Sequence, residues 1–365
     1  TNISYSSGSG DSCFPPSAIL NVPLYEFFFT GTDMKKHLLI AMCCLAVMTA
    51  RAQTATDSLI NAATRYIDKQ EYDKAIEIYT TALKKQPGQS QLLSKAASAY
   101  LIKGDYRNAV IYSGKVLENT NEHRLEAYLI KGSALDLDGK DEACIETFKA
   151  GIKEFGYHPL LSYNLAFNYY RNKNITETVN TLERSIYRTP THPGSHLLLA
   201  NALLKQNKHP EALLALYYFL LLEPNTERSI TAFSLITEIF DSRITTTADN
   251  EIEIITDLSA ETQFANIDLL LSLLVNQQFS EANRNKTGFD RYLDFTSAIF
   301  GVLSPDTAKM DNYSIWWDLY VPFFSALGHS GQVQAYCYFT TQSLSKSSLE
   351  WIRNNPAAFR EFSEW

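Results

Sequence analysis

Residues 56–89 read TDSLINAATRYIDKQEYDKAIEIYTTALKKQPGQ, and this stretch decides the fold. Its small residues are Ala63, Ala75 and Ala82, and Pro87 closes it. The same pattern of small residues returns about every 34 residues, five times along the chain. A fixed period of this length is typical of an array of repeated supersecondary units. Such arrays usually bind other molecules along an extended surface, so the sequence indicates a mode of action without naming a partner.

Alignment on the small residues divides the region 56–226 into five units, each predicted to form two amphipathic helices joined by a tight turn. Small side chains at the eighth, twentieth and twenty-seventh positions would let neighbouring helices approach closely. Gly104 and Gly139 suit the left-handed conformation that ends a helix, and Asn174 and Asn207 are expected to replace glycine near the equivalent sites. The units are 56–89, 90–123, 125–158, 159–192 and 193–226.

These units resemble the tetratricopeptide repeat (TPR) family. The segments YDKAIEIY (72–79) and YNLAFNYY (163–170) are similar to the family pattern almost residue by residue. The resemblance implies an all-α fold, an α-solenoid of five helix-turn-helix repeats, followed by a helical C-terminal cap domain. Phe219 at a normally small site and His209-Pro210 depart from the pattern, so we expect the fifth unit to be opened or capped differently.

The resemblance also implies that the first helices of the units line a concave groove that binds a protein or peptide. The fourth and fifth units carry the side chains best suited to such contacts, because aromatic residues bury large areas and polar ones orient a peptide. The alternative is that these aromatic residues pack against the C-terminal region. The predicted peptide-binding residues are Tyr163, Phe167, Tyr170, Arg171, Leu197, Asn201 and Lys205.

From residue 227 to 365 the repeat register is lost while helical periodicity continues. Helices are expected near 229–241, 262–277, 289–303, 313–329, 331–344, 346–353 and 356–365, with polar linkers at 242–251 and 280–288. Aromatic residues crowd this region, and Trp316 and Trp317 are adjacent. One interpretation is a helical cap with an aromatic core. The other is an aromatic platform, which would make the protein a glycan- or small-ligand-binding accessory protein.

The segment 34–52 has the order of a signal peptide: Met34-Lys35-Lys36, an apolar run, and Ala50 and Ala52 at the end. The apolar run is too short to span a bilayer, which disfavours the alternative of a membrane anchor. We therefore expect cleavage after Ala52 and a periplasmic or secreted bacterial protein without a membrane span. Residues 1–33 are interpreted as upstream sequence or an N-terminal extension.

Composition limits the remaining functions. The net charge is −8, and no basic stripe is present to meet the phosphates of a nucleic acid. No motif for an enzyme, a cofactor or a metal site is found, and His192 and His196 lack a third ligand although their spacing is metal-like. Cys144 and Cys337 are expected to be buried thiols; a disulfide between them is the alternative. The sequence predicts a binding scaffold that is not an enzyme, in an unknown oligomeric state.

Overall fold

The computed structural model describes residues 56–119, 121–242, 244–246, 252–254, 264–278, 283, 285–304 and 314–365. The predicted signal segment 34–52 and the residues before it lie outside these ranges. The chain divides into two compact units, Thr1–Ser58 and Leu59–Trp365. The elements named below belong to the second unit.

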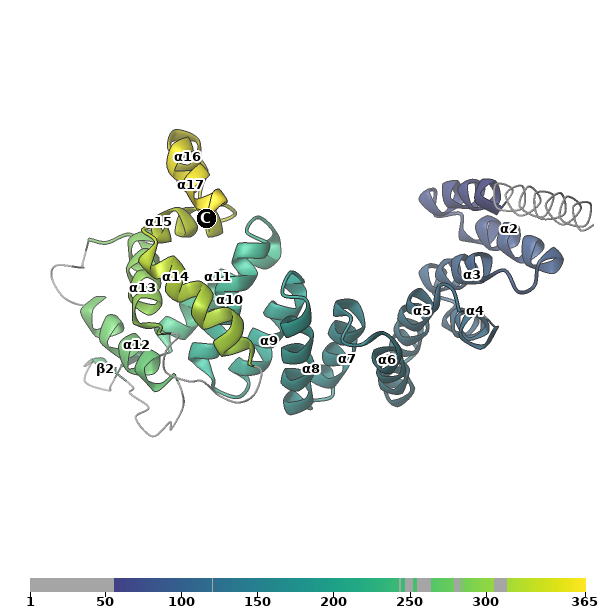
Figure 1. Cartoon of the computed structure of the whole chain (residues 1–365), viewed down its shortest axis with the longest axis horizontal. Coiled ribbons are helices and arrows are strands. Elements are labelled where there is room, and N and C mark those ends of the chain that lie inside the picture. Colours follow the sequence, from purple (N-terminus) through teal and green to yellow (C-terminus); the bar gives the residue numbers. More distant parts are fainter. Residues whose placement is uncertain are drawn as a thin grey trace, which may run out of the picture. The chain divides into compact units, whose positions relative to one another are not determined.

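The repeat region consists of consecutive helices joined by short turns, and each helix packs against the next along the chain (Figure 1). This arrangement confirms the predicted α-solenoid of helix pairs. The pairs are helical residues 59–68 with α2 (Tyr72–Lys85), α3 (Ser90–Lys103) with α4 (Tyr106–Asn119), α5 (Arg124–Leu137) with α6 (Asp141–Phe155), α7 (Pro159–Arg171) with α8 (Ile175–Arg188), and α9 (Pro193–Leu204) with α10 (His209–Leu222).

The small residues lie where helices cross, as the period predicts. Ala63 and Ala75 are completely buried, as are their equivalents in the following units. Gly132 shows how close the approach is, because a Cβ atom added there would lie 2.4 Å from the ring of Phe148. That separation is far below van der Waals contact, so even a methyl group would force the buried Phe148 ring to move.

The fifteenth residue of every unit adopts a positive φ and ends the first helix. Two of these residues are the predicted glycines, and Asn207 takes the role expected of it. Asn174 does not, because Lys173 takes the left-handed conformation, and the Asn174 side chain instead accepts a hydrogen bond from the Glu177 N–H (3.3 Å) at the start of α8. The φ values are 61° at Gln70, 87° at Gly104, 70° at Gly139, 59° at Lys173 and 58° at Asn207.

The C-terminal region forms the predicted helical cap. A short antiparallel pair of strands has Ile244 opposite Ile254; its first strand lies within the polar linker expected at 242–251, and its second begins directly after it. The elements are α11 (Glu227–Asp241), β1 (Ile244–Thr246), β2 (Ile252–Ile254), α12 (Ala265–Gln278), α13 (Gly288–Val302), the π-helical turn η3 (Trp316–Tyr320), α14 (Val321–His329), α15 (Val333–Thr340), α16 (Lys346–Asn354) and α17 (Pro356–Glu364).

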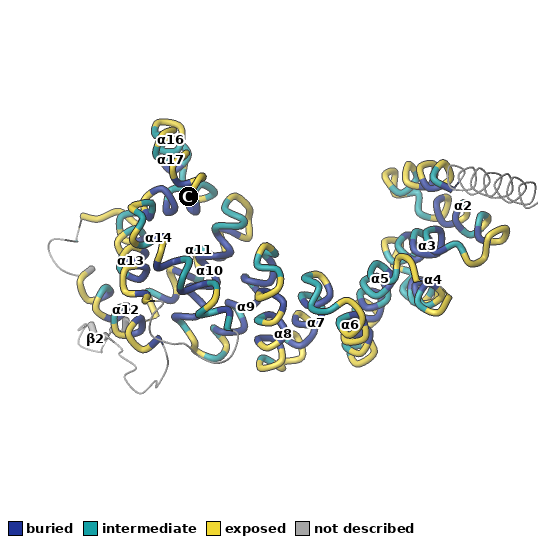
Figure 2. The backbone as a smooth tube through the Cα atoms, in the orientation of Figure 1, coloured by how far each residue is buried: buried dark blue, intermediate teal, exposed yellow. Residues whose placement is uncertain are grey.

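Helix α10, the second helix of the fifth unit, is enclosed by the cap. Every residue from Pro210 to Leu220 is buried, because α10 packs against α9 on one side and against α11, α12, α15 and η3 on the others (Figure 2). A helix that is apolar all round is stable only when it is enclosed in this way. Phe219, which departs from the repeat pattern, therefore lies in the core that the fifth unit shares with the cap.

The aromatic residues of the cap mostly form this core. Tyr217 of α10 lies among the rings of Phe300 (5.1 Å) and Phe324 (6.1 Å), and its backbone carbonyl accepts a 2.7 Å hydrogen bond from the Tyr336 hydroxyl. Tyr320, Phe324 and Tyr336 are completely buried. These contacts favour the interpretation of a cap with an aromatic core over that of an exposed platform.

The helix expected over 313–329 begins with the π-helical turn η3 and continues as the α-helix α14, which contains Pro322 in its first turn. The Val321 N–H bonds to the carbonyl of Trp316 five residues earlier, and Pro322, which has no N–H, follows in the first turn of α14. Trp316 and Trp317 are both half-buried, because Phe264 stacks on Trp317 (5.5 Å) and meets Trp316 edge-on (6.1 Å). Neither indole is fully exposed.

Both cysteines within the described residues are free and buried, as predicted. Burial raises the pKa of the Cys144 thiol to about 12 and that of Cys337 further. Among the described helices, none combines the length and the apolar character needed to cross a membrane.

Candidate peptide-binding surface

The first helices of successive units meet one another as well as their own partners. Helix α3 contacts α5, α5 contacts α7, and α7 contacts α9. These four helices therefore share one side of the array, which we call the first-helix face. The residues predicted to bind a peptide lie on α7 and α9, with Lys205 capping the C-terminal end of α9.

Two predicted residues form an aromatic pair on this face. The rings of Tyr163 and Phe167, one helical turn apart on α7, are stacked with centroids 6.3 Å apart and planes inclined by 16°. Phe167 keeps 37% of its surface exposed, whereas Tyr163 is half-buried. Gly194 of α9 makes room for the Tyr163 ring, since a Cβ atom added there would lie 3.1 Å from it. The pair is therefore held in place on one side and open to solvent on the other.

The neighbouring predicted residues are less exposed. Tyr170 and Leu197 pack against the large core cluster that continues into the cap. The Asn201 side-chain amide donates to the Leu197 carbonyl at 2.8 Å, a bond within its own helix. Tyr163 is also half-buried against this cluster. The alternative, in which the aromatic residues pack toward the C-terminal region, therefore describes part of the surroundings of Tyr163, Tyr170 and Leu197.

The two predicted cations differ in their surroundings. The Arg171 guanidinium lies 2.6 Å from a carboxylate oxygen of Asp136 on α5 and 3.2 Å from one of Asp141 on α6. These ion pairs link the fourth unit to the third and neutralise much of the Arg171 charge. Lys205 is exposed at the end of α9. A ligand carboxylate that binds Arg171 would have to compete with Asp136 and Asp141. At Lys205 it would meet a solvent-exposed ammonium group.

Two residues that the sequence prediction left out border the aromatic pair. The His192 ring meets Tyr163 edge-on at 5.4 Å and caps α9 by accepting from the Ser195 N–H at 3.2 Å. Burial, followed by the charge of Arg228, lowers the pKa of His192. The Arg228 guanidinium of α11 lies 5.6 Å from the centroid of the Phe219 ring and forms an ion pair with Glu223. The sequence could have indicated that His192 caps α9, because it directly precedes Pro193. It could not indicate that α11 brings Arg228 close to this site.

His192 and His196 therefore have separate structural roles. His196 is completely buried, and its ring bonds to the Tyr320 hydroxyl (2.6 Å) and to the Pro190 carbonyl (2.7 Å). Within the described residues, no group of three or more His, Cys, Asp or Glu side chains is arranged to hold a metal ion.

The first-helix face also carries exposed apolar side chains in the earlier units. Ile102 at the end of α3 is 51% exposed, and Leu137 at the end of α5 is 59% exposed. Both occupy the thirteenth position of their units, where the fourth and fifth units have Arg171 and Lys205. The character of the face thus changes from apolar to cationic along the array at this position.

Comparison with known proteins identifies the repeats. Residues 60–122 match the sequence profile of the tetratricopeptide repeat. The chain contains tetratricopeptide repeats. The matched segment falls within the first two units, and the remaining three TPR units repeat the same helix pair.

Among curated proteins, this TPR chain is similar to the BBSome complex member BBS4 of Bos taurus, with 28% identity over 127 residues. The match covers 34% of this chain and spans about a quarter of that relative, 24% of its length.

Solved structures similar to this TPR protein include MamA from Desulfovibrio magneticus RS-1, residue 41 to the end (17% identity, TM-score 0.40, 46% of this chain and 94% of that one). Another is the C-terminal part of a TPR repeat-containing protein from Cytophaga hutchinsonii (13% identity, TM-score 0.43, 80% of this chain and 98% of that one).

Proposed function

We propose that this TPR protein is an exported, non-enzymatic scaffold that holds a protein or peptide on its first-helix face. The observation that carries the proposal is the stacked pair of Tyr163 and Phe167, in which the Tyr163 ring packs close to Gly194 and Phe167 remains 37% exposed. Rigid aromatic side chains of this kind dominate the binding energy of many interfaces because they bury large areas and lose little conformational freedom.

The surroundings of the pair define the ligand in general terms. His192 meets Tyr163 edge-on, Arg228 is near enough for its charge to interact with Tyr163, and Lys205 lies exposed at the end of the neighbouring α9. A peptide with an apolar or aromatic side chain next to an acidic group would complement these features. Arg171 is assigned a smaller role than the sequence predicted, since Asp136 and Asp141 already bind its guanidinium.

The binding proposal is tested by capture of the partner with the purified protein carrying a photo-crosslinker beside α7. The Tyr163→Ala, Phe167→Ala double variant is expected to weaken crosslinking about thirtyfold or more, as for the loss of a central aromatic anchor. Tyr187→Ala is the matched control, because Tyr187 is an exposed tyrosine (44%) on α8, a second helix. Equal loss in the double variant and the control, or no loss in either, would show that the partner binds elsewhere.

Export rests on the segment 34–52, which lies outside the described residues. Expression of the chain from Met34 in a bacterium, followed by N-terminal sequencing of the envelope fraction, is expected to give a protein that starts at Gln53. A cytoplasmic protein that keeps the apolar segment would show this part of the proposal to be wrong.

A further inference from the structure

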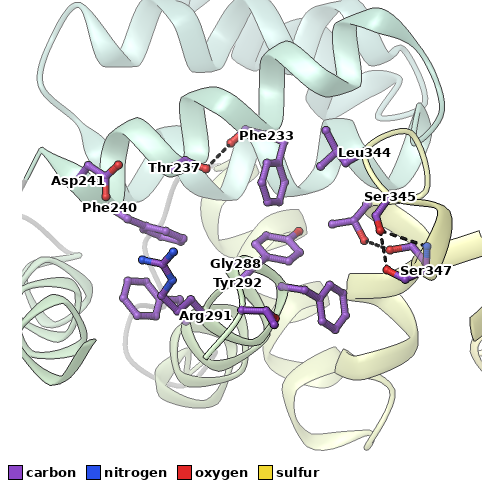
Figure 3. A pocket seen from close by; sticks show the side chains of 15 residues that line it. Phe233, Thr237, Phe240, Asp241, Gly288, Arg291, Tyr292, Leu344, Ser345 and Ser347 are labelled. Atoms are coloured by element: carbon purple, nitrogen blue, oxygen red, sulfur yellow. Dashed lines mark hydrogen bonds between the residues drawn. The ribbon is translucent and has the colours of Figure 1, made fainter. Parts of the chain in front are cut away.

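The cap contains a pocket that is separate from the first-helix face. It lies between α11, α13 and the segment that joins α15 to α16, and its volume is about 520 Å³ (Figure 3). Pockets of a few hundred cubic ångströms are typical of sites that enclose a small ligand or one residue of a larger one.

The rings that line the pocket are held in position before any ligand arrives. Three of them are half-buried, and each is in contact with a second ring. Such preorganised rings lose little freedom when they bind. The pairs are Phe233 with Tyr292 (4.9 Å), Phe240 with Phe295 (4.6 Å) and Phe289 with Tyr338 (4.2 Å).

The hydroxyl groups around the pocket already take part in hydrogen bonds within the protein. Thr237 Oγ1 donates to the Phe233 carbonyl (3.1 Å), and Thr341 Oγ1 donates to the Cys337 carbonyl (2.7 Å). Ser345 and Ser347 bond to each other through their hydroxyls at 2.5 Å. A sugar needs many free donors and acceptors around its ring, so these engaged hydroxyls favour an apolar occupant.

Charge is concentrated at one end of the pocket. Asp241 and Arg291 lie there beside Phe240, while Ser345 and Ser347 lie at the opposite end (Figure 3). The neighbouring acid Asp294 is paired with Lys286 at 2.5 Å. Within the described part of the chain, no carboxylate oxygen lies within ion-pairing distance of Arg291. Its guanidinium is therefore available to a ligand carboxylate, which it can bind through two parallel hydrogen bonds.

We propose that this pocket binds the C-terminal residue of a polypeptide whose last side chain is large and apolar. The terminal carboxylate pairs with Arg291, the side chain lies among the three rings, and the last backbone N–H donates to Asp241. A C-terminal residue supplies all three groups within the length of one amino acid.

The openness of the pocket favours the end of a chain over a free small molecule. Thr237, Gly288 and Leu344 are exposed along its rim. Free small ligands usually have most of their surface buried in their sites. A chain end needs only its last residue enclosed, and the open rim leaves room for the rest of the chain to pass into solvent.

The test uses the whole protein and a fluorescein-labelled glycine-serine peptide that ends in phenylalanine with a free carboxylate. Saturable binding in fluorescence polarisation is expected, and the same peptide with an amidated end is expected to bind at least tenfold more weakly. Arg291→Gln should weaken the carboxylate peptide by a similar factor without affecting the amidated one, and Arg353→Gln, on an exposed arginine of α16, should change neither. Equal binding of the two peptides, or no binding of either, overturns the proposal.

A pair of glycine variants tests the location. A Cβ atom added at Gly288 or at Gly301 meets nothing within 4 Å, so α13 tolerates a side chain at both positions. Only Gly288 lines the pocket. Gly288→Trp is expected to abolish binding, whereas Gly301→Trp leaves it unchanged. Binding that survives Gly288→Trp places the site elsewhere. Free phenylalanine is tested as a competitor. If it displaces the peptide at an equal concentration, the pocket binds a small molecule and not a chain end, and the proposal is wrong.

Discussion

Lowering the pH should loosen the junction between the fifth repeat and the cap, because a buried neutral histidine lies there. The Pro190 carbonyl can only accept, so His196 Nε2 carries the proton and donates to it (2.7 Å), and Nδ1 accepts from the Tyr320 hydroxyl (2.6 Å). The ring also stacks on Tyr218 at 4.6 Å. Protonation of Nδ1 would prevent it from accepting from the Tyr320 hydroxyl and would place a charge where no water solvates it.

The magnitude follows from the pKa. Burial lowers the pKa of His196 from 6.5 to about 4. The unfolded chain therefore binds more protons than the folded one between these two values, so stability is complete above pH 6.5 and falls as the pH decreases toward 4. The difference corresponds to roughly 3 kcal/mol, a large fraction of the stability of an ordinary domain.

Two other groups near the junction act in the opposite direction. Burial raises the pKa of Glu183, whose carboxylate accepts from Trp316 Nε1 (3.0 Å), and that of Glu211. Carboxyl groups with a raised pKa in the folded state gain stability on acidification. The total pH dependence thus combines opposing contributions, and a variant that removes only His196 is needed to separate them.

His196→Phe provides that variant, because it keeps a ring against Tyr218 and cannot be protonated. At pH 7.5 it should be less stable than the parent by about 2 kcal/mol, since the Pro190 carbonyl and the Tyr320 hydroxyl lose their partner. Near pH 4 the parent has lost the histidine contribution, so the difference should vanish or reverse.

Urea unfolding followed by tryptophan fluorescence from pH 7.5 to 4 measures this, because all four tryptophans lie at or after residue 316 and report on the cap. His329→Phe, on an exposed histidine of α14, should keep the pH dependence of the parent. A stability difference between His196→Phe and the parent that stays constant across this pH range would refute the reasoning.

Three further predictions concern the repeats and the thiols. Ala75→Trp should cost about 1–3 kcal/mol in urea unfolding, because the site is fully buried at a helix crossing, and an unchanged midpoint would show the register to be wrong. Lys173→Gly should stabilise the protein by about 1 kcal/mol in the same assay, since Lys173 has a φ of 59° that glycine adopts without strain; a loss of stability would contradict this. Cys144 and Cys337 should resist alkylation at pH 8 until urea unfolds the chain, because both thiols are buried with raised pKa values, and rapid labelling of the native protein would show that they are accessible.

The repeat architecture was predictable because its signals are local. A small residue at a helix crossing, such as Ala63, and a glycine at a turn, such as Gly104, act within one unit or between neighbours, so their period appears directly in the sequence. The pairing of Arg171 with Asp136 and Asp141 was not predictable, because it depends on the rotation between the third and fourth units. The repeat period also predicted that the peptide-binding residues share one face of the array. Their role in binding stays a prediction.

The sequence by itself determined the helix pairs, their turns and the small contact sites, since each depends on residues within about one repeat. Only the tertiary structure decided that the cap encloses α10, that His196 of the fifth repeat bonds to Tyr320 far along the chain, and that Asp241 and Arg291 line the same pocket. These features depend on contacts between residues distant in sequence. Helical periodicity specifies which face of a helix is apolar but not which distant helix will cover it.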